Sequence, residues 1–317
     1  MPAAAPQKGN RGRSTVRKVT LGKLTWYDFG QLGPADLKYL QQRFKFHPLD
    51  FEDLQSTQQR PKLDEYDAYV FLIFHVPFYD RRTRRMVADE VNVFIGQDYV
   101  VTVHAGRNKQ LGRLFDEVKG TQTLRHEYMS KGSGFLLYEL ISRLFEHSFP
   151  MLDKIAERID MVEREILDGN TREMTEELSY LKLEIINFRR IIRPQRAVVQ
   201  ALEDKNKRFL PERLDIYFDD VLDTLGRTSD LLENYKEVVE SLEDTNETII
   251  QHRTNNVVKV LTLISLVTLP GASISGLLAM NLRYPFPVDE RLFYIAVGLS
   301  VTFAVTLLLY MYRKRWL

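Results

Sequence analysis

The chain has 317 residues, a formal net charge of +1 and no cysteine. The absence of cysteine excludes disulfide bonds and thiolate metal sites, and the near-neutral charge gives no electrostatic indication of nucleic acid as a partner. The sequence contains no phosphate-binding loop and no GxGxxG or GxSxG motif, so we expect neither an enzyme nor an organic cofactor.

The N-terminal part is expected to begin with a tail and to continue as a mixed α/β domain. Residues 1–20 are basic and lack an apolar stretch, which argues against a signal peptide and predicts a disordered cytosolic tail. Residues 21–130 alternate between strand and helix patterns. The expected strands are Leu24–Gly30, part of Tyr66–Tyr79, and a hairpin of Met86–Phe94 with Tyr99–Val103, and the expected helices are Pro34–Phe46, one from Pro48, and one ending near Lys119.

Residues 131–253 change to long helical patterns and are expected to form a stalk. Two heptad runs are separated by Gly169-Asn170, which predicts an antiparallel helical hairpin. A third helix is expected from near Pro211, and no proline interrupts it before Pro270. Such a helix would continue for about 65 residues, roughly 100 Å. The heptad positions are Leu152, Ile155, Ile159, Val162 and Ile166 in the first run, and Leu178, Leu181, Ile185, Phe188 and Ile192 in the second.

Residues 254–281 and 292–312 are expected to be transmembrane helices, joined by a periplasmic loop at 282–291. No charge interrupts residues 260–282, and that length spans the roughly 30 Å hydrocarbon core of a bilayer. Arg253 and Lys259 lie at the start of the first span, and residues 313–317 form a basic tail after the second. The positive-inside rule therefore predicts that both termini are cytoplasmic.

One face of the first span carries small or polar residues at steps of three, four or seven, and the opposite face is bulky and apolar. The segment alone is compatible with an ordinary helix–helix contact, which small residues favour, and with a pore-lining helix. Two helices cannot enclose a conduit, so a pore would require several copies about an axis. The residues of this face are Asn255, Thr262, Ser265, Leu269, Ala272 and Gly276.

Acidic residues cluster at two places in the part expected to be cytoplasmic. The first cluster is Asp50, Glu52 and Asp53, and the second is Asp219, Asp220 and Asp223. Carboxylates can hold a hydrated Mg²⁺ ion, because this ion prefers oxygen ligands and retains several of its waters. Residues in such patterns are more often a solvated helix face, and the sequence pattern leaves both interpretations open.

Nearly the whole chain, from about Thr25, resembles the CorA superfamily of divalent-cation channels. The resemblance depends on several motifs at family spacing, each weak alone and specific together. These are His47-Pro48-Leu49, Glu52-Asp53-Leu54, residues 59–62 (QRPK), residues 69–71 (YVF), residues 217–220 (YFDD), the polar Asp244 and Asn255, residues 258–262 (VKVLT), Pro270, Gly276, Met280-Asn281 and a basic C-terminal tail ending in Trp316-Leu317.

The resemblance implies a funnel-shaped homopentamer in the bacterial inner membrane. Each subunit would have an α+β cytoplasmic domain, a long helical stalk and two C-terminal transmembrane helices. Asp53 and Asp220 match the family's regulatory pair, which binds a divalent ion between neighbouring subunits. Val258 and Leu261 match its hydrophobic constriction, where an apolar ring gates by dewetting. A divalent metal ion, Mg²⁺ or a related ion, would be both cargo and regulatory ligand.

The outer mouth departs from the family signature GMN, because this chain has Ala279-Met280-Asn281. A Cβ at position 279 restricts the backbone conformations that glycine would allow, whereas Asn281 retains its amide oxygen. Arg283 stands where typical members carry an acid, and five arginines near a mouth would repel cations unless Asp289 and Glu290 offset them. Selectivity for magnesium over zinc, cobalt or nickel is therefore open.

Two functions of different classes follow. The first is a passive channel for divalent cations in which the ion enters at Asn281, passes Ala272, Ser265 and Thr262, and leaves past Asn255 and Asp244. The second is a non-conducting, CorA-like membrane-anchored sensor or partner-binding protein that has lost the GMN filter, which Ala279 and Arg283 favour.

Overall fold

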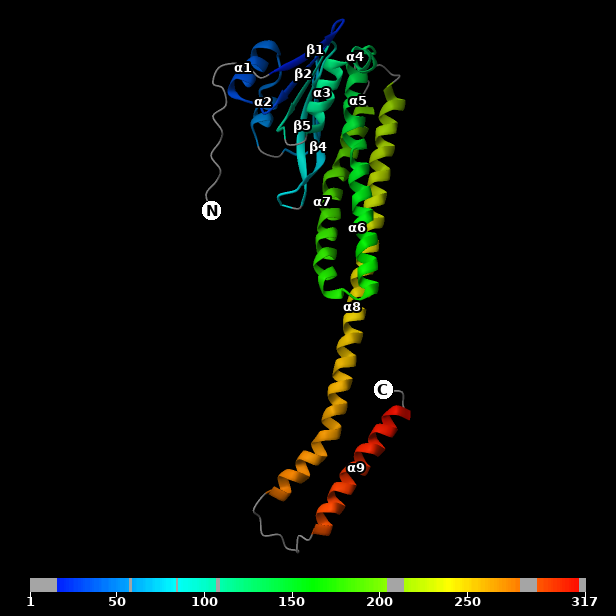
Figure 1. Cartoon of the computed structure of the whole chain (residues 1–317). Coiled ribbons are helices and arrows are strands. Elements are labelled where there is room, and N and C mark those ends of the chain that lie inside the picture. Colours follow the sequence, from blue (N-terminus) through cyan, green and yellow to red (C-terminus); the bar gives the residue numbers. More distant parts are fainter. Residues whose placement is uncertain are drawn as a thin grey trace. The chain divides into compact units, whose positions relative to one another are not determined.

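The computed structural model describes residues 16–56, 59–83, 85–106, 109–203, 214–279 and 290–313 (Figure 1). The chain divides into two compact units, Met1–Leu242 and Glu243–Leu317. The first unit contains a sheet of six strands with helices on both faces, and the second contains helices in the part that the structure describes.

The sheet has the order β1-β2-β6-β5-β4-β3. The pair β2·β6 is parallel, and the other four neighbouring pairs are antiparallel. The β5·β6 pair is the hairpin that the sequence predicts around residues 96–98. The strands are β1 (Arg17–Leu21), β2 (Leu24–Gly30), β3 (Lys62–Glu65), β4 (Val70–Asp80), β5 (Arg85–Ile95) and β6 (Tyr99–His104).

Two helices lie between β2 and β3 in the chain, and the other helices that the structure describes follow β6. The longest of them is α8. The expected helices over Pro34–Phe46, from Pro48 and up to Lys119 are confirmed as α1, α2 and α3. The helices are α1 (Pro34–Arg43), α2 (Pro48–Gln55), α3 (Lys109–Gly120), α4 (Gln122–Met129), α5 (Ser133–Glu146), α6 (Ser148–Asp168), α7 (Thr171–Glu203), α8 (Asp215–Ala279) and α9 (Glu290–Arg313).

Both faces of the sheet are covered, so the central strands are apolar on both sides. Successive side chains of a strand point to opposite faces. On β2, Tyr27 and Phe29 belong to the core shared with Leu40 of α1 and Phe51 of α2. Trp26, on the other face, meets Phe115 of α3 with ring centroids 4.9 Å apart. Burying these large side chains from water supplies the main stabilising term of the domain.

Two boundaries predicted from the sequence are wrong. Residues 17–20 are not part of a disordered tail, because they form β1 and pair with β2. Arg17 fixes this strand through an ion pair with the buried Asp28. The boundary between residues 130 and 131 does not separate a domain from a stalk either. Helices α5 and α7 pack against strands of the sheet, so the sheet and these helices form one unit.

The predicted helical hairpin is confirmed as α6 and α7, which pack against each other. Gly169 ends α6 with φ +102°, a left-handed conformation that favours glycine, and its N–H donates to the carbonyl oxygens of Glu165 and Ile166. Arg158 of α6 joins the two helices through carboxylate oxygens of Glu177, at 2.6 Å, and Glu184, at 2.5 Å.

The long third helix is confirmed as α8, which is 65 residues long. The part of α8 before Leu242 belongs to the first unit, and its apolar side chains at heptad spacing are buried there. The ring of Tyr217 packs against Phe135 of α5. Lys182 of α7 lies 3.9 Å from Glu240 of α8. The buried positions include Phe218, Val221, Leu225, Leu232 and Val239. The expected helix start near Pro211 lies outside the described residues.

Candidate cation pathway and regulatory cluster

The residues predicted to line a pore share one exposed face of α8. We call this face the seam: Asn255, Val258, Thr262, Ser265, Leu269, Ala272 and Gly276, at alternating steps of three and four, with Leu261 beside it. Every one of these residues is exposed in the single chain. In a helix of 3.6 residues per turn, this spacing aligns side chains along one line.

The same spacing extends the seam toward the N-terminus of α8. Gln251, Thr248 and Asp244 precede Asn255 at steps of four, three and four, and all three are exposed. Asp244 was expected at the exit of a pore, whereas Thr248 and Gln251 were missed although the heptad spacing could have identified them. The complete line begins with a carboxylate and polar groups, passes the apolar Val258 and Leu261, and ends with hydroxyl and small residues.

The hydroxyl groups on this helix donate to its own backbone. Thr262 donates to the carbonyl oxygen of Val258 at 2.8 Å, and Ser265 donates to that of Leu261 at 2.9 Å. Such bonds to residue i−4 satisfy the hydroxyl hydrogen without a partner on another helix. The lone pairs of both oxygens remain available to accept hydrogen bonds, and water molecules bound to a cation are strong donors.

Two apolar side chains interrupt the polar part of the seam. Val258 is 52% exposed and Leu261 is 58% exposed. They belong to a longer stretch of exposed apolar side chains on α8, and a continuous apolar surface of this kind is typical of contact with another apolar surface or with lipid.

The predicted mouth lies almost entirely outside the described residues. Ala279 is the last residue of α8 and Glu290 the first of α9, but the structure describes neither side chain. Met280, Asn281, Arg283 and Asp289 lie between the described ranges 214–279 and 290–313. Their assignments therefore stay predictions.

The second unit contains a segment with the length and composition of a membrane span. Within α8, an 18-residue window is apolar enough to cross a bilayer, and none of that window is buried. Helix α9 has a shorter apolar stretch at Val297–Met311 and ends at the basic Arg313. Pro270 lies inside α8 and has no N–H to donate to the carbonyl of Leu266, yet the helix continues to Ala279.

The acidic cluster around Asp50 and Asp53 is not simply a solvated helix face, which is the interpretation that the sequence favours. Ligand oxygens of Asp50, Asp53 and Asp64 all lie within 4.8 Å of one another. Asp50 and Asp53 come from α2, which Pro48 begins, and Asp64 comes from β3 at the edge of the sheet. Glu52 is exposed and does not belong to this group of three, whereas Asp64 was missed because β3 was not predicted.

A lysine already places a positive charge in this cluster. Lys62 Nζ lies 2.8 Å from Asp53 Oδ2 and 2.5 Å from Asp64 Oδ2. Burial lowers the pKa of Lys62, but hydrogen bonds to Asp53 and Asp64 outweigh it, so the pKa stands above its usual range. The three carboxylates fit a divalent cation in ligand type, and such an ion would compete with this ammonium group.

Asp50 is bound by protein groups and does not face solvent. It is fully buried, and it accepts hydrogen bonds from Tyr66 Oη at 2.8 Å and Tyr69 Oη at 2.6 Å. Burial raises the pKa of the Asp50 carboxyl, and burial together with the bond to Asp50 raises the pKa of Tyr66 to about 12. Asp50 therefore anchors α2 to the segment before β4, and Asp53 and Asp64, which are both partly exposed, are the members accessible to a ligand.

The other predicted regulatory residue, Asp220, is not brought to Asp53 within one chain. Asp220 is exposed on α8, and Asp53 is half-buried on α2. Figure 1 shows α2 and the start of α8 separated by the sheet and the helices packed on it. A single chain thus has the two carboxylates on different outer surfaces of the first unit, and only a second copy could bring such a pair together.

The family described as "CorA-like Mg2+ transporter protein" matches residues 22–315. The chain belongs to this CorA-like family. The family consists of transporters, which agrees with the expectation that the chain is not an enzyme. The motifs around His47, Asp53 and Tyr217 therefore carried the correct family assignment.

Curated relatives cover nearly the full chain. The cobalt/magnesium transport protein CorA of Thermotoga maritima is 27% identical over 298 residues, which are 92% of this chain and 83% of the relative. The putative metal ion transporter YfjQ of Bacillus subtilis is 26% identical over 304 residues, 95% of this chain and 93% of the relative.

Solved structures show the same fold. The complete structure of the CorA magnesium transporter from Methanocaldococcus jannaschii matches with a TM-score of 0.79 at 20% identity, covering 94% of each chain. The full-length CmaX protein matches with a TM-score of 0.74 at 19% identity, covering 92% of this chain and 88% of that one. The α/β domain followed by long helices is thus a CorA-type fold.

Proposed function

We propose that this protein is a passive channel for divalent metal cations, Mg²⁺ or a related ion, in the bacterial inner membrane. The observation that carries the proposal is the seam of α8, a continuous line of exposed residues from Asp244 to Gly276. A line that is polar at one end, apolar at Val258 and Leu261, and hydroxyl-bearing beyond them suits a hydrated ion that passes a dewetting gate. Relatives that are named cobalt/magnesium transport proteins support the choice of cargo.

The proposed assembly is a homopentamer with the seam turned toward the axis. One helix cannot enclose a conduit, whereas five copies related by rotation would close a ring and cover the exposed Val258 and Leu261 with their own symmetry mates. Residues 254–281 and 292–312 would be the two spans, with both termini cytoplasmic and residues 282–291 outside. The bulky face of α8 would then meet lipid or α9.

At the outer mouth, we assign the selectivity filter to Ala279, Met280 and Asn281. Five Asn281 amide oxygens would meet the waters of the incoming ion, which fits a cation such as Mg²⁺ that loses its hydration shell reluctantly. Arg283 would oppose cation entry, and Asp289 and Glu290 would offset it. This mixture of charges is the reason to measure zinc, cobalt and nickel alongside magnesium.

The proposed regulation uses Asp53 of one subunit and Asp220 of its neighbour. A divalent ion between them would neutralise two like charges that otherwise repel, by a few kcal/mol at close contact for an effective dielectric near 20. Because α8 runs as one helix from Asp215 to Ala279, a shift of Asp220 could be transmitted to the seam. High cytoplasmic metal would hold the pore closed, and depletion would open it.

A non-conducting sensor with the same architecture is the alternative, and the substitutions at Ala279 and Arg283 are its specific support. The test is ion uptake into liposomes containing the purified protein, with magnesium, cobalt, nickel and zinc compared at equal protein content. Saturable uptake of at least one of these ions supports the channel. Absence of uptake of all four, from protein whose pentameric mass is intact, supports the sensor.

A further inference from the structure

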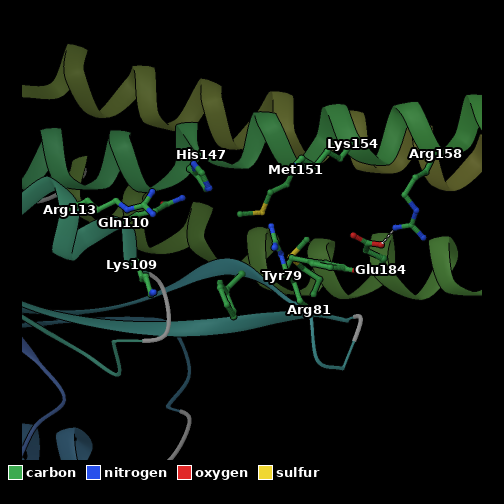
Figure 2. Close-up of a pocket in the computed structure, with 12 residues that line it drawn as sticks. Tyr79, Arg81, Lys109, Gln110, Arg113, His147, Met151, Lys154, Arg158 and Glu184 are labelled. Atoms are coloured by element: carbon green, nitrogen blue, oxygen red, sulfur yellow. Dashed lines mark hydrogen bonds and ion pairs between the residues drawn. The ribbon is translucent and has the colours of Figure 1, made fainter.

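The first unit contains a cavity that the proposed pore does not use. It has a volume of about 830 Å³, within the range of small-molecule sites. The C-terminal end of β4 and the N-terminal end of β5 form one wall of the cavity. The start of α3 forms a second wall, and α6 and α7 form the others (Figure 2). These elements all belong to Met1–Leu242, so one subunit builds the whole cavity.

Positive charge dominates the lining of this cavity. Arg81, Lys109, Arg113 and Lys154 all contribute to its wall. Within the described residues, none of these four side chains forms an ion pair with a carboxylate. The carboxylate of Glu184 also lines the cavity, but it is bound to Arg158 at 2.5 Å and compensates that residue. Positive charges therefore outnumber negative ones in the lining of the cavity, which attracts anions and repels free metal ions.

His147 lines the same cavity. Burial lowers the pKa of His147, and the charges of Lys154 and Arg113 lower it further. The imidazole is therefore neutral at neutral pH, and it can donate or accept a hydrogen bond without adding a fifth charge. Lys109 is also the first residue of α3, where the backbone N–H groups of the first helical turn favour an anion.

The cavity also has an apolar part. Phe78, Tyr79 and Met151 are half-buried in its wall, and Met86 is buried. Figure 2 shows Lys109, Gln110 and Arg113 at one end and the Arg158–Glu184 pair at the other, with Met151 and Tyr79 between them. Aromatic rings and methionine sulfur offer a flat, polarisable surface for another ring.

We propose that this cavity binds a small phosphorylated molecule with an aromatic ring, of the nucleoside triphosphate class. The phosphates lie at the Lys109 and Arg113 end, and the ring lies beside Tyr79 and Met151. Lysine and arginine are the side chains that bind phosphate oxygens most strongly, and a triphosphate can use several at once. A half-open cavity of about 830 Å³ has room for a nucleotide.

The test is calorimetric titration of the full chain, purified in detergent and freed of metal, with ATP, inorganic triphosphate and adenosine as separate probes. We expect ATP to bind with sub-millimolar affinity, more tightly than triphosphate, and adenosine to bind least. The double variant Lys109→Glu/Arg113→Glu should weaken ATP binding at least tenfold. The control is Lys119→Glu, an exposed change of the same type on the same helix, which should leave the affinity unchanged.

A second variant tests the ring site. Tyr79→Ala should weaken the binding of ATP and leave that of triphosphate unchanged, because only ATP places a ring at this position. The proposal is overturned if ATP does not bind, or if it binds equally to the wild type and to the Lys109→Glu/Arg113→Glu variant of unchanged oligomeric mass. Triphosphate that binds as tightly as ATP would overturn the nucleotide class and leave an inorganic polyphosphate as the ligand.

Discussion

The ammonium nitrogen of Lys62 lies 2.8 Å from a carboxylate oxygen of Asp53, the residue to which we assign metal regulation. The same nitrogen lies 2.5 Å from Asp64, so one lysine neutralises part of a three-carboxylate cluster. A divalent ion that binds Asp53 has to compete with this internal cation. The competition sets a lower limit on the metal concentration at which regulation would begin.

We predict that Lys62→Met increases the affinity of the protein for magnesium at its regulatory site. Removal of a positive charge within bonding distance of Asp53 strengthens the attraction of that carboxylate for a metal ion. We expect a change of about tenfold, which corresponds to about 1.4 kcal/mol. Magnesium titration monitored by protease resistance would measure it. Lys38→Met, an exposed change on α1, is the control, and equal midpoints for both variants would exclude competition by Lys62.

The proposed gate predicts a change in basal flux. Leu261→Ser should increase divalent-ion leak several-fold in liposomes, because a polar ring retains water where an apolar ring would expel it. Val267→Ser is the matched control, since Val267 is also exposed but lies on the opposite face of α8. If both variants leak equally, the effect comes from weakened helix packing and not from a gate at Leu261.

Regulation by an intersubunit ion predicts metal-dependent protection of the stalk. Addition of magnesium should slow proteolysis of α6 and α7 in the wild type, and the double variant Asp53→Ala/Asp220→Ala should lose this protection. Asp160→Ala/Asp168→Ala also removes two carboxylates, both exposed on α6, and should retain the protection. Protection that persists in the first double variant would place the regulatory ion elsewhere.

The buried pair Arg17–Asp28 predicts a pH-dependent contribution to stability. Burial raises the pKa of Asp28, but His104, Thr102 and Arg17 outweigh it, so the pKa lies below 3.8. Its contribution is therefore present above about pH 4 and is lost as pH falls through the folded-state pKa. Because Arg17 is one-third exposed, Arg17→Ala should cost about 2 to 3 kcal/mol at pH 7, at or below the lower end of the range for a broken buried pair.

Thermal unfolding of the full chain, followed by tryptophan fluorescence, would measure this effect, since the buried Trp26 lies against Phe115 beneath Arg17. The difference in Tm between the wild type and Arg17→Ala should shrink as the pH falls through the lowered folded-state pKa of Asp28, where the carboxylate becomes protonated. Lys18→Ala, an exposed change in the same strand, should leave Tm within a degree or two at every pH. A pH-independent difference would show that Arg17 acts through packing alone.

The elements with strong periodicity could be predicted from the sequence. The heptads before and after Gly169 and the uninterrupted run toward Pro270 specify α6, α7 and α8, because side-chain spacing alone determines which face of a helix is apolar. The strand Lys62–Glu65 was missed because its residues are mostly charged and short edge strands depend on pairing with a neighbour. Strand Arg17–Leu21 was missed for a similar reason, since its pairing with β2 and the Arg17–Asp28 contact are tertiary.

The candidate sites were predictable to different degrees. The seam follows from a repeating step of three and four, and the structure adds Thr248 and Gln251 by the same rule. The Lys62 ammonium beside Asp53 could not be predicted, because it depends on β3 folding back against α2. The cavity lined by Arg81, Lys109, Arg113 and Lys154 also has no sequence signal, since its lining residues come from five helices and strands and from the segments beside them.

The central claim is that the chain conducts divalent cations through a pore ending at Asn281. Uptake of magnesium, cobalt, nickel and zinc into liposomes should be compared between the wild type and Asn281→Ala at equal protein content. We predict saturable uptake of at least one ion by the wild type, reduced at least tenfold in the variant, because the ring of amide oxygens is removed. Equal uptake by the two proteins, or uptake of none of the four ions by the wild type, would contradict the claim.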